Sequence, residues 1–257
     1  MFSLNNKIAV VTGGAGHLGS AMTEGLAECG AKVFALSRGT HHMEKIKQWN
    51  TDYPNQIRFI KCDVSSRNSI ESAYKEIFDL HGKIDVLVNN AYFGANGHLE
   101  DISEENWMEG IEGSINTVYR CTQAVIPYMK HSSAGSIINI ASMYGIVSPD
   151  PDIYGNSGFD NPPNYGAGKA AIIQFTRYAA CHLAKYKIRV NSITPGPFPN
   201  EKTQENKDFI SKLAQKVPLK RIGRPDELKG IVILLASNAS SYITGTNIPV
   251  DGGWTAW

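Results

Sequence analysis

The chain has 257 residues, of which 42% are hydrophobic, and its 25 basic and 24 acidic side chains leave a formal net charge of +1. That length suits one large α/β domain or two small ones, and the balanced charge gives no overall attraction to nucleic acid or to an acidic membrane surface. Four widely spaced cysteines and a short first apolar run argue against a disulfide framework, a signal peptide and a membrane span, so we expect a cytoplasmic protein with reduced thiols.

Short β-rich runs alternate with helical patterns along the chain. In chain order, strand and helix pairs are predicted at Ile8–Val11 and Leu18–Cys29, Lys32–Leu36 and Met43–Tyr53, Arg58–Cys62 and Ser69–His81, Asp85–Val88 and Glu104–Lys130, Ser136–Ile140 and Tyr165–Lys185, and Ile188–Ile193 and Pro225–Ser237, with a last strand at Asn247–Val250. Continuous apolar strands separated by helices are typical of a parallel sheet covered on both faces. The sequence therefore predicts an α/β fold, a single doubly wound, Rossmann-like domain over residues 1–257.

Two stretches interrupt this alternation. Residues 148–164 are rich in Pro, Asp, Asn and Gly, and residues 195–218 have the pattern of a loop and a short helix. The first stretch joins a strand to the next helix at the sheet edge where α/β proteins bind ligands. We therefore expect an active-site insertion at 148–164 and a lid-like segment at 197–218.

The first strand runs directly into a glycine-rich turn, Thr12 to Gly19, which a helix follows. Gly14, Gly16 and Gly19 form the G-x-G-x-x-G pattern in the strand–helix context of dinucleotide binding. Glycines let the backbone approach a pyrophosphate, and the helix N-terminus offers free N–H groups and the positive end of its dipole. The alternative is a glycine-rich turn that binds nothing.

The end of the second strand bears on the choice between NADP and NAD. The acidic residue that usually binds the ribose 2′-hydroxyl of NAD is absent, and Ser37-Arg38 stands there. An arginine can pair with a 2′-phosphate through two parallel N–H donors, whereas a carboxylate would repel that phosphate. We expect NADP as the cofactor, with NAD as the alternative if Arg38 is only a solvated loop charge.

Taken together, these motifs resemble those of the classical short-chain dehydrogenase/reductase family over nearly the whole chain. The matching elements are Thr12 to Gly19, Asp63-Val64, Asn89-Asn90-Ala91-Tyr92, Asn116, Ser142, Tyr165-x-x-x-Lys169, Pro195-Gly196 and Asp251-Gly252-Gly253. The resemblance implies an NAD(P)-dependent enzyme without a catalytic metal, whose catalytic residues are Asn116, Ser142, Tyr165 and Lys169. With the turn and Ser37-Arg38, it predicts cofactor contacts from Gly13, Gly14, Gly16, His17, Leu18, Gly19, Ser37, Arg38, Asp63, Val64, Asn90, Ala91, Tyr165, Lys169, Pro195, Gly196 and Phe198.

The chain departs from the family pattern at several positions. His17 replaces the middle glycine of the turn, and Asn200 stands where the family often has a threonine that touches the nicotinamide. Tyr92 replaces the glycine of Asn-Asn-Ala-Gly, so its ring must point into the cleft or pack on the next loop. The segment between Ser142 and Tyr165 is longer than the family usually has.

Carbonyl reduction needs a hydride donor, a proton donor and a group that polarises the oxygen. Tyr165 would donate the proton, and Lys169, one helical turn further on the same face, would favour the phenolate and lower its pKa. Ser142 would hydrogen-bond the substrate oxygen. By resemblance, Lys169 also binds the nicotinamide ribose and Asn116 holds a water in a proton relay. Taken singly, each residue has a purely structural alternative, such as a packed aromatic, a solvated charge or a cap.

The sequence thus predicts an NADP(H)-dependent oxidoreductase that interconverts a secondary alcohol and a ketone. The polar groups of residues 148–164 suit a polyhydroxylated substrate such as a sugar or sugar acid. A 3-oxoacyl-type reductase of the same family is one alternative, and a non-catalytic dinucleotide sensor is an alternative from another class.

The expected partners are a small-molecule substrate and further copies of the chain, with no nucleic acid and no membrane. Related enzymes pair the helices that hold Asn116 and Tyr165, commonly in tetramers of two-fold symmetry. The apolar side chains that we expect at these contacts are Ile172, Ile173, Phe175, Tyr178 and Trp257.

Overall fold

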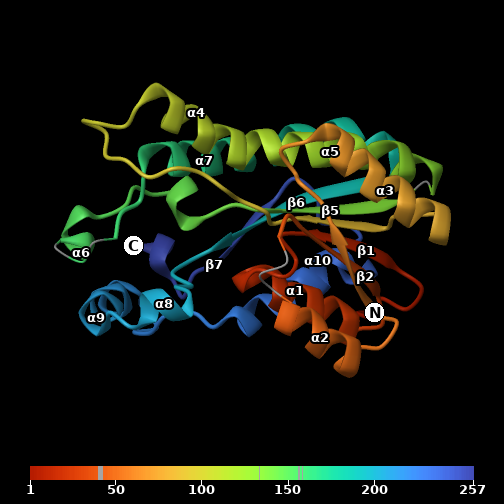
Figure 1. Cartoon of the computed structure of the whole chain (residues 1–257), viewed down its shortest axis with the longest axis horizontal. Helices are drawn as coiled ribbons and strands as arrows, with labels where there is room; N and C mark the ends of the chain where they lie inside the picture. Colours follow the sequence, from red (N-terminus) through yellow and green to blue (C-terminus); the bar gives the residue numbers. More distant parts are fainter. Residues whose placement is uncertain (40–42, 133, 156, 158) are drawn as a thin grey trace.

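The computed structural model describes residues 1–39, 43–132, 134–155, 157 and 159–257 (Figure 1). In this part of the chain, seven strands pair in parallel in one sheet, in the order β3-β2-β1-β4-β5-β6-β7. The strands are β1 (Ile8–Thr12), β2 (Lys32–Ser37), β3 (Ile57–Lys61), β4 (Val86–Asn89), β5 (Gly135–Ile140), β6 (Ile188–Pro195) and β7 (Asn247–Val250). The prediction of a doubly wound parallel sheet is confirmed.

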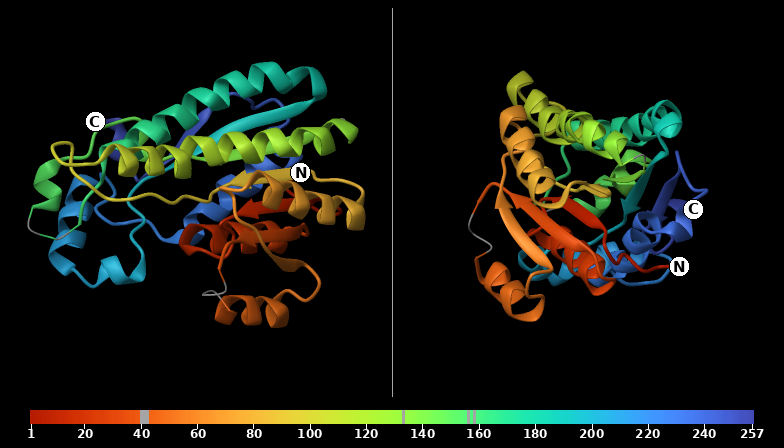
Figure 2. Two further views of the ribbon diagram at one scale, coloured as in Figure 1. Left: turned by 45° about the horizontal axis from the view of Figure 1, so that its top comes forward. Right: turned by 90° about the vertical axis from the view of Figure 1, so that its right-hand side faces the viewer.

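Helices cover both faces of this sheet, as the two views of Figure 2 show. One face packs against α1 (His17–Glu28), α2 (Met43–Asp52) and α10 (Lys229–Ala236), and the other against α3 (Arg67–His81), α5 (Thr117–His131) and α7 (Pro163–Leu183). Within β1, Val10 packs with the second helix layer and Val11 with the first, and both are fully buried. Burial on both faces explains why the strands are continuous apolar runs and not alternating ones.

The structure divides the predicted helix Glu104–Lys130 into three parts. These are α4 (Glu104–Ile111), a five-residue π-helix η1 (Glu112–Asn116) and α5. Gly113 lies so close to the carbonyl of Phe93 that any side chain at that position would collide with it. π-Helical turns inside α-helices are frequent at functional sites, and here the turn ends at Asn116.

The remaining helical elements are short. The insertion contains α6 (Pro151–Tyr154), and the lid segment contains α8 (Glu201–Gln204) and α9 (Lys207–Lys216). The 3₁₀ turns are η2 (Met143–Gly145), η3 (Ala184–Tyr186), η4 (Pro225–Leu228), η5 (Asn238–Ser240) and η6 (Trp254–Ala256). Among the described helices, none is long and apolar enough to cross a bilayer.

Candidate active site

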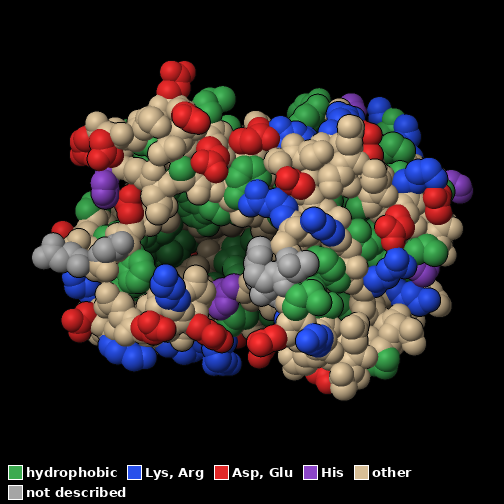
Figure 3. Space-filling model, viewed as in Figure 1, with side chains coloured by type: hydrophobic (Ala, Val, Ile, Leu, Met, Phe, Trp, Pro, Cys, Tyr) green, Lys and Arg blue, Asp and Glu red, His purple; other side chains and the backbone are tan. Residues whose placement is uncertain are grey.

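A cavity of about 870 Å³ opens at the carboxyl edge of the sheet, over the turn between β1 and α1. Figure 3 shows the molecule hollowed on this face. The predicted cofactor contacts that line the cavity are Gly13, Gly16, His17, Leu18, Ser37, Arg38, Val64, Asn90, Ala91, Tyr165 and Phe198. The predicted contacts Gly14, Gly19, Asp63, Lys169, Pro195 and Gly196 do not line it.

The glycine-rich turn leaves the start of α1 free to take an anion. The N-cap of α1 is Gly16, so no side chain caps the first N–H groups of the helix. Gly13 has a φ of +62°, and a Cβ at that position would lie 2.9 Å from Nδ2 of Asn90. Gly14 packs against Ala35, and Gly19 packs against the carbonyl of Gly13. Gly14 and Gly19 therefore allow the turn to pack closely on the rest of the fold. The concave face of the turn, lined by Gly13 and Gly16, fits a pyrophosphate.

Polar contacts tie this turn to the strand beside it. Nδ2 of Asn90 donates to the carbonyls of Thr12 (3.0 Å) and Gly13 (3.1 Å). The hydroxyl of Thr12 accepts from the backbone N–H groups of Asn90 (3.0 Å) and Ala91 (3.1 Å). The segment Asn90-Ala91 thus fixes the floor of the cavity between β1 and β4.

At one end of the cavity, the exposed guanidinium of Arg38 stands over the ring of Phe93, 4.8 Å from its centre. Asp63 lies nearby, but its carboxylate accepts from the N–H and the hydroxyl of Ser65 (2.9 and 2.7 Å). Burial would raise the pKa of Asp63, but these hydrogen bonds and the charge of Arg38 lower it below its usual range. Ser37 and Arg38 both line the cavity, as the sequence predicts for a ribose-binding pair.

The predicted catalytic residues Tyr165, Lys169 and Ser142 come from two adjacent elements. Tyr165 lies in the first turn of α7 and lines the cavity, whereas Lys169, one turn further, is only 4% exposed. The ammonium of Lys169 donates to the carbonyl of Ile140 at the end of β5 (2.9 Å). Ser142 caps η2 just beyond that strand, where its hydroxyl accepts from the N–H of Tyr144 (3.2 Å).

The pKa values of this group differ from the sequence-based expectation. Burial raises the pKa of Tyr165, and the nearby Ser142 hydroxyl opposes part of that rise. Burial also lowers the pKa of Lys169 to about 8. The lowering expected from Lys169 does not outweigh burial in this arrangement, where the ammonium lies 5.6 Å from the centre of the phenol ring and donates to the carbonyl of Ile140.

The structure does not bring the side chain of Asn116 into the cavity. Its Nδ2 donates to Oε2 of Glu112 within the π-helix (2.8 Å), and Glu112 also pairs with Arg120. The hydrogen bond from Arg120 is the main reason why the pKa of Glu112 is lowered. The amide of Asn116 is therefore held by the carboxylate of Glu112, which is itself paired with Arg120 of α5.

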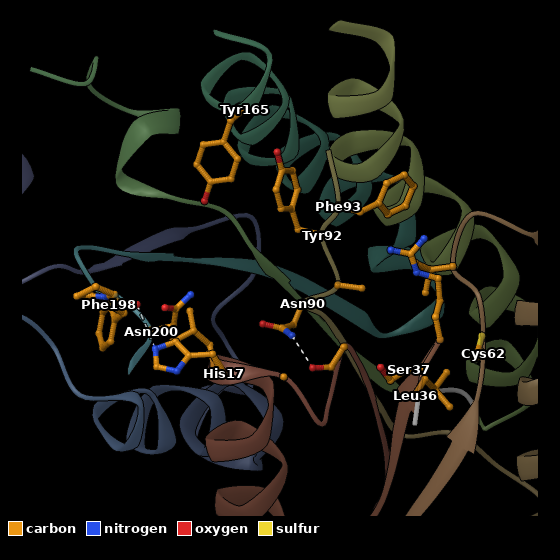
Figure 4. A pocket seen from close by; sticks show the side chains of 18 of the residues that line it. His17, Leu36, Ser37, Cys62, Asn90, Tyr92, Phe93, Tyr165, Phe198 and Asn200 are labelled. Atoms are coloured by element: carbon orange, nitrogen blue, oxygen red, sulfur yellow. Dashed lines mark hydrogen bonds between the residues drawn. The ribbon is translucent and has the colours of Figure 1, made fainter. Parts of the chain in front are cut away.

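Sequence reasoning missed several residues that line the cavity. These are Leu36, Gly39, Cys62, Phe93, Pro199 and Thr203, while Tyr92 and Asn200 were singled out only as departures from the family pattern. Leu36 lies at the carboxyl end of β2 and Cys62 directly after β3, so the predicted sheet topology could have found both. Figure 4 shows the rings of Tyr165 and Tyr92 on one wall, with His17 and Asn200 opposite.

The insertion and the lid segment pack against each other beside Tyr165. The centre of the Phe209 ring in α9 lies 4.8 Å from that of Phe159 and 5.7 Å from that of Tyr154. These rings belong to an apolar cluster that Tyr165 also contacts. Lys216 pairs with Asp150 (2.6 Å) across the same boundary. Asn156 and Gly158 of the insertion lie outside the described residues. Within the described ranges, no group of three or more His, Cys, Asp or Glu side chains could hold a metal ion.

Comparisons with known proteins agree over nearly the full length. A family model described as enoyl-(acyl carrier protein) reductase matches residues 13–255. The 3-oxoacyl-[acyl-carrier-protein] reductase FabG of Thermotoga maritima is 34% identical, covering 97% of this chain and 98% of the relative. The RhlG/NADP active-site complex of Pseudomonas aeruginosa is 31% identical with a TM-score of 0.89, covering 99% and 98% of the two chains. An NAD+-bound xylitol dehydrogenase is 30% identical with a TM-score of 0.88, covering 97% and 99%.

Proposed function

The chain belongs to the short-chain dehydrogenase/reductase family and is an NAD(P)-dependent oxidoreductase, and from that premise we propose that it interconverts a secondary alcohol and a ketone with NADP(H). The observation that carries the proposal is the position of Tyr165. Its phenol lines the same cavity as the uncapped start of α1, so an acid/base group and a pyrophosphate cradle share one space.

The residues of the cavity fit a nicotinamide dinucleotide. Gly13, Gly16 and the first turn of α1 would hold the pyrophosphate, and Val64 and Ala91 would line the adenosine and nicotinamide ends. When bound, the nicotinamide supplies or accepts a hydride at the substrate carbon. Neither Gly13 nor Gly16 places a side chain between the backbone and this ligand.

Tyr165 moves the proton in the proposed reaction. In reduction its hydroxyl gives a proton to the substrate oxygen, and in oxidation its phenolate takes that proton back. The hydroxyl of Ser142 donates a hydrogen bond to the same oxygen, and the positive charge of Lys169 stabilises negative charge that develops beside it. Asn116 holds the π-helical turn through Glu112 and contributes to the position of α4 and α5.

Ser37 and Arg38 support NADP(H) over NAD(H). Ser37 places a small hydroxyl where a selecting carboxylate would repel a 2′-phosphate, and the exposed Arg38 can offer that phosphate two donors. The relatives alone do not discriminate between NADP and NAD as the cofactor, because one similar structure is an NADP complex and another holds NAD+.

The substrate that we propose is polyhydroxylated, such as a sugar or sugar acid. Asn200 and Thr203 line the cavity on the lid side and offer amide and hydroxyl groups, and one of the similar structures is a xylitol dehydrogenase. The second candidate is a 3-oxoacyl substrate, the class named for the FabG relative, because the apolar cluster of Ile153, Phe159 and Phe209 packs beside Tyr165.

Cofactor absorbance measured with two substrate panels separates these candidates. The first panel holds sugar alcohols, sugar acids and their keto forms, and the second holds acetoacetyl thioesters of short thiols. We expect a kcat/KM at least about tenfold higher on the best member of the first panel. A preference for the thioesters would replace the substrate proposal, and no turnover on either panel would favour a dinucleotide-binding sensor.

We also propose that residues 148–164 and 197–218 form the walls of the substrate site and that the chain assembles as a homotetramer. Ile172 and Ile173, expected at the subunit contact, are buried within their own chain. Tyr119, Tyr178 and Trp257 remain 45%, 65% and 74% exposed, which supports contacts through α5, α7 and the C-terminal residues. A monomer by light scattering at micromolar concentration would contradict this assembly. The four free thiols support a cytoplasmic location.

A further inference from the structure

Tyr92 stands where the family motif has a glycine, and its ring forms part of the wall between the cavity and α7. The ring meets that of Tyr165 edge to face, with centres 5.0 Å apart and planes at 82° (Figure 4). Its hydroxyl fits against Gly94, where a Cβ would lie 2.7 Å from that oxygen and 3.1 Å from Cα of Gly110. The absence of a side chain at Gly94 therefore leaves the space that the phenol of Tyr92 needs.

The same ring also borders Lys169. The ammonium lies 5.5 Å from the centre of the Tyr92 ring and 5.6 Å from the centre of the Tyr165 ring. One of these phenols comes from the loop after β4 and the other from the helix of Lys169 itself. From β5 it meets the carbonyl of Ile140, and from η2 Gly145 packs against the backbone of Lys169.

We propose that Tyr92 is a positioning residue of the active site, whose ring holds the phenol of Tyr165 edge-on and keeps water from Lys169 on the cavity side. The inference rests on the proposed function for the roles of Tyr165 and Lys169. A glycine at this position would leave that side of the lysine open to water. The chain thus has an aromatic wall at a position where the family pattern has no side chain.

The charge states of these groups agree with this role. Burial lowers the pKa of Lys169 to about 8, because the charged ammonium loses contact with water. Removing the Tyr92 ring admits water, which favours the charged amine and raises its pKa. Partial burial raises the pKa of Tyr92 itself to about 12, so its ring stays a neutral phenol near neutral pH.

The test compares Tyr92→Gly, which restores the family residue, with Tyr92→Phe, which keeps the ring. Lysine labelled with carbon-13 at Cε reports the titration of Lys169 by NMR in the full chain without substrate, and Lys169→Arg assigns the signal. We expect the Phe variant to titrate as the wild type does and the Gly variant to titrate about one pH unit higher. An unchanged midpoint in the Gly variant, or an equal shift in both variants, would overturn the proposal.

A second measurement links this result to turnover. On a substrate found in the panels above, the alkaline pH at which kcat/KM falls should move upward in the Gly variant, because Lys169 then keeps its charge to higher pH. The Phe variant should keep the wild-type profile. Failure to find any substrate would contradict the proposed function while the NMR titration still decides the role of Tyr92. Thermal unfolding of each variant shows whether it is folded. If the Gly variant is not folded, Tyr92→Ala, which also removes the ring, carries the test against the Phe variant with the same expected shift and the same contradicting outcome.

Discussion

Nε2 of His17 lies 3.2 Å from the backbone carbonyl oxygen of Phe198. This contact links the phosphate-binding turn to the first residues of the lid segment. The glycine that the family has at this position could not make the contact. The ring must carry its proton on Nε2 to donate, so the contact selects the neutral Nε2–H tautomer or the imidazolium. The lid segment is therefore anchored directly to the turn that would hold the cofactor.

His17→Gly should free this end of the lid segment. The loss of one hydrogen bond, worth about 0.5–1.5 kcal/mol, should weaken NADPH binding by about two- to tenfold and speed limited proteolysis within residues 197–218. His17→Gln is the matched control, because its amide can donate to the same carbonyl. Equal cleavage rates in the wild type and the Gly variant would mean that the contact does not hold the lid.

Cofactor choice should depend on Ser37 and Arg38. Because the pair is partly exposed, we expect a preference of about 1–3 kcal/mol, or roughly five- to 150-fold, for NADPH over NADH. Ser37→Asp should reverse it, and Arg38→Ala should weaken NADPH binding while leaving NADH binding unchanged. Side-by-side fluorescence titrations measure both ligands. Equal or tighter binding of NADH by the wild type would show that Arg38 is only a solvated charge.

Phe209→Ala should separate the lid segment from the insertion. Phe209 is 6% exposed and packs on Phe159 and Tyr154, so its truncation removes the aromatic contact between the two segments. The KM for the substrate should rise, whereas the dissociation constant for NADPH should change little. The KM of Phe209→Leu, which keeps an apolar side chain, should lie between those of Phe209→Ala and the wild type. Parallel losses of NADPH and substrate binding would contradict a role confined to the substrate walls.

The stability of the chain in acid should depend on Glu227. The hydrogen bond from Arg221 and the backbone N–H of Arg224 lower the pKa of Glu227 to about 2, against about 4.3 in an unfolded chain. A lowered folded pKa stabilises the protein above the unfolded pKa, and this stability is lost as the pH falls toward the folded value. Glu227→Gln should therefore cost about 1 kcal/mol or less near neutral pH, after solvent screening. Urea unfolding should show the difference shrinking between about pH 5 and pH 3, and a difference that is constant with pH would refute the assignment.

The central strands could be predicted from the sequence because they are buried on both faces, which leaves a continuous apolar signal such as Ile8–Val11. The edge strands β3 and β7 are partly exposed. The break in the helix from Glu104 could not be predicted, because it arises from the close approach of Gly113 to the carbonyl of Phe93, a contact between distant segments. The apolar side of the insertion could not be predicted from its polar composition, since Ile153 and Phe159 pack with Phe209 of α9 and Asp150 pairs with Lys216 of the same helix.

The spacing of Tyr165 and Lys169 predicted that they share one face of a helix, which the structure bears out. The direction of the Lys169 ammonium could not be predicted, because it depends on the carbonyl of Ile140 at the end of β5, a residue of another segment. The partner of Asn116 was missed, although Glu112 lies four residues before it, a spacing at which side chains meet on one face of a helix. Spacing gives the face of a helix, but the partner of a buried polar group depends on tertiary packing.

The proposed acid/base role of Tyr165 is tested most directly by Tyr165→Phe, assayed on the best substrate from the panels. The substitution removes one hydroxyl and keeps the ring that packs against Tyr92, so the fold and NADPH binding should be retained. We predict a loss of about 10²-fold or more in kcat with an unchanged dissociation constant for NADPH. Turnover near the wild-type rate would contradict the account.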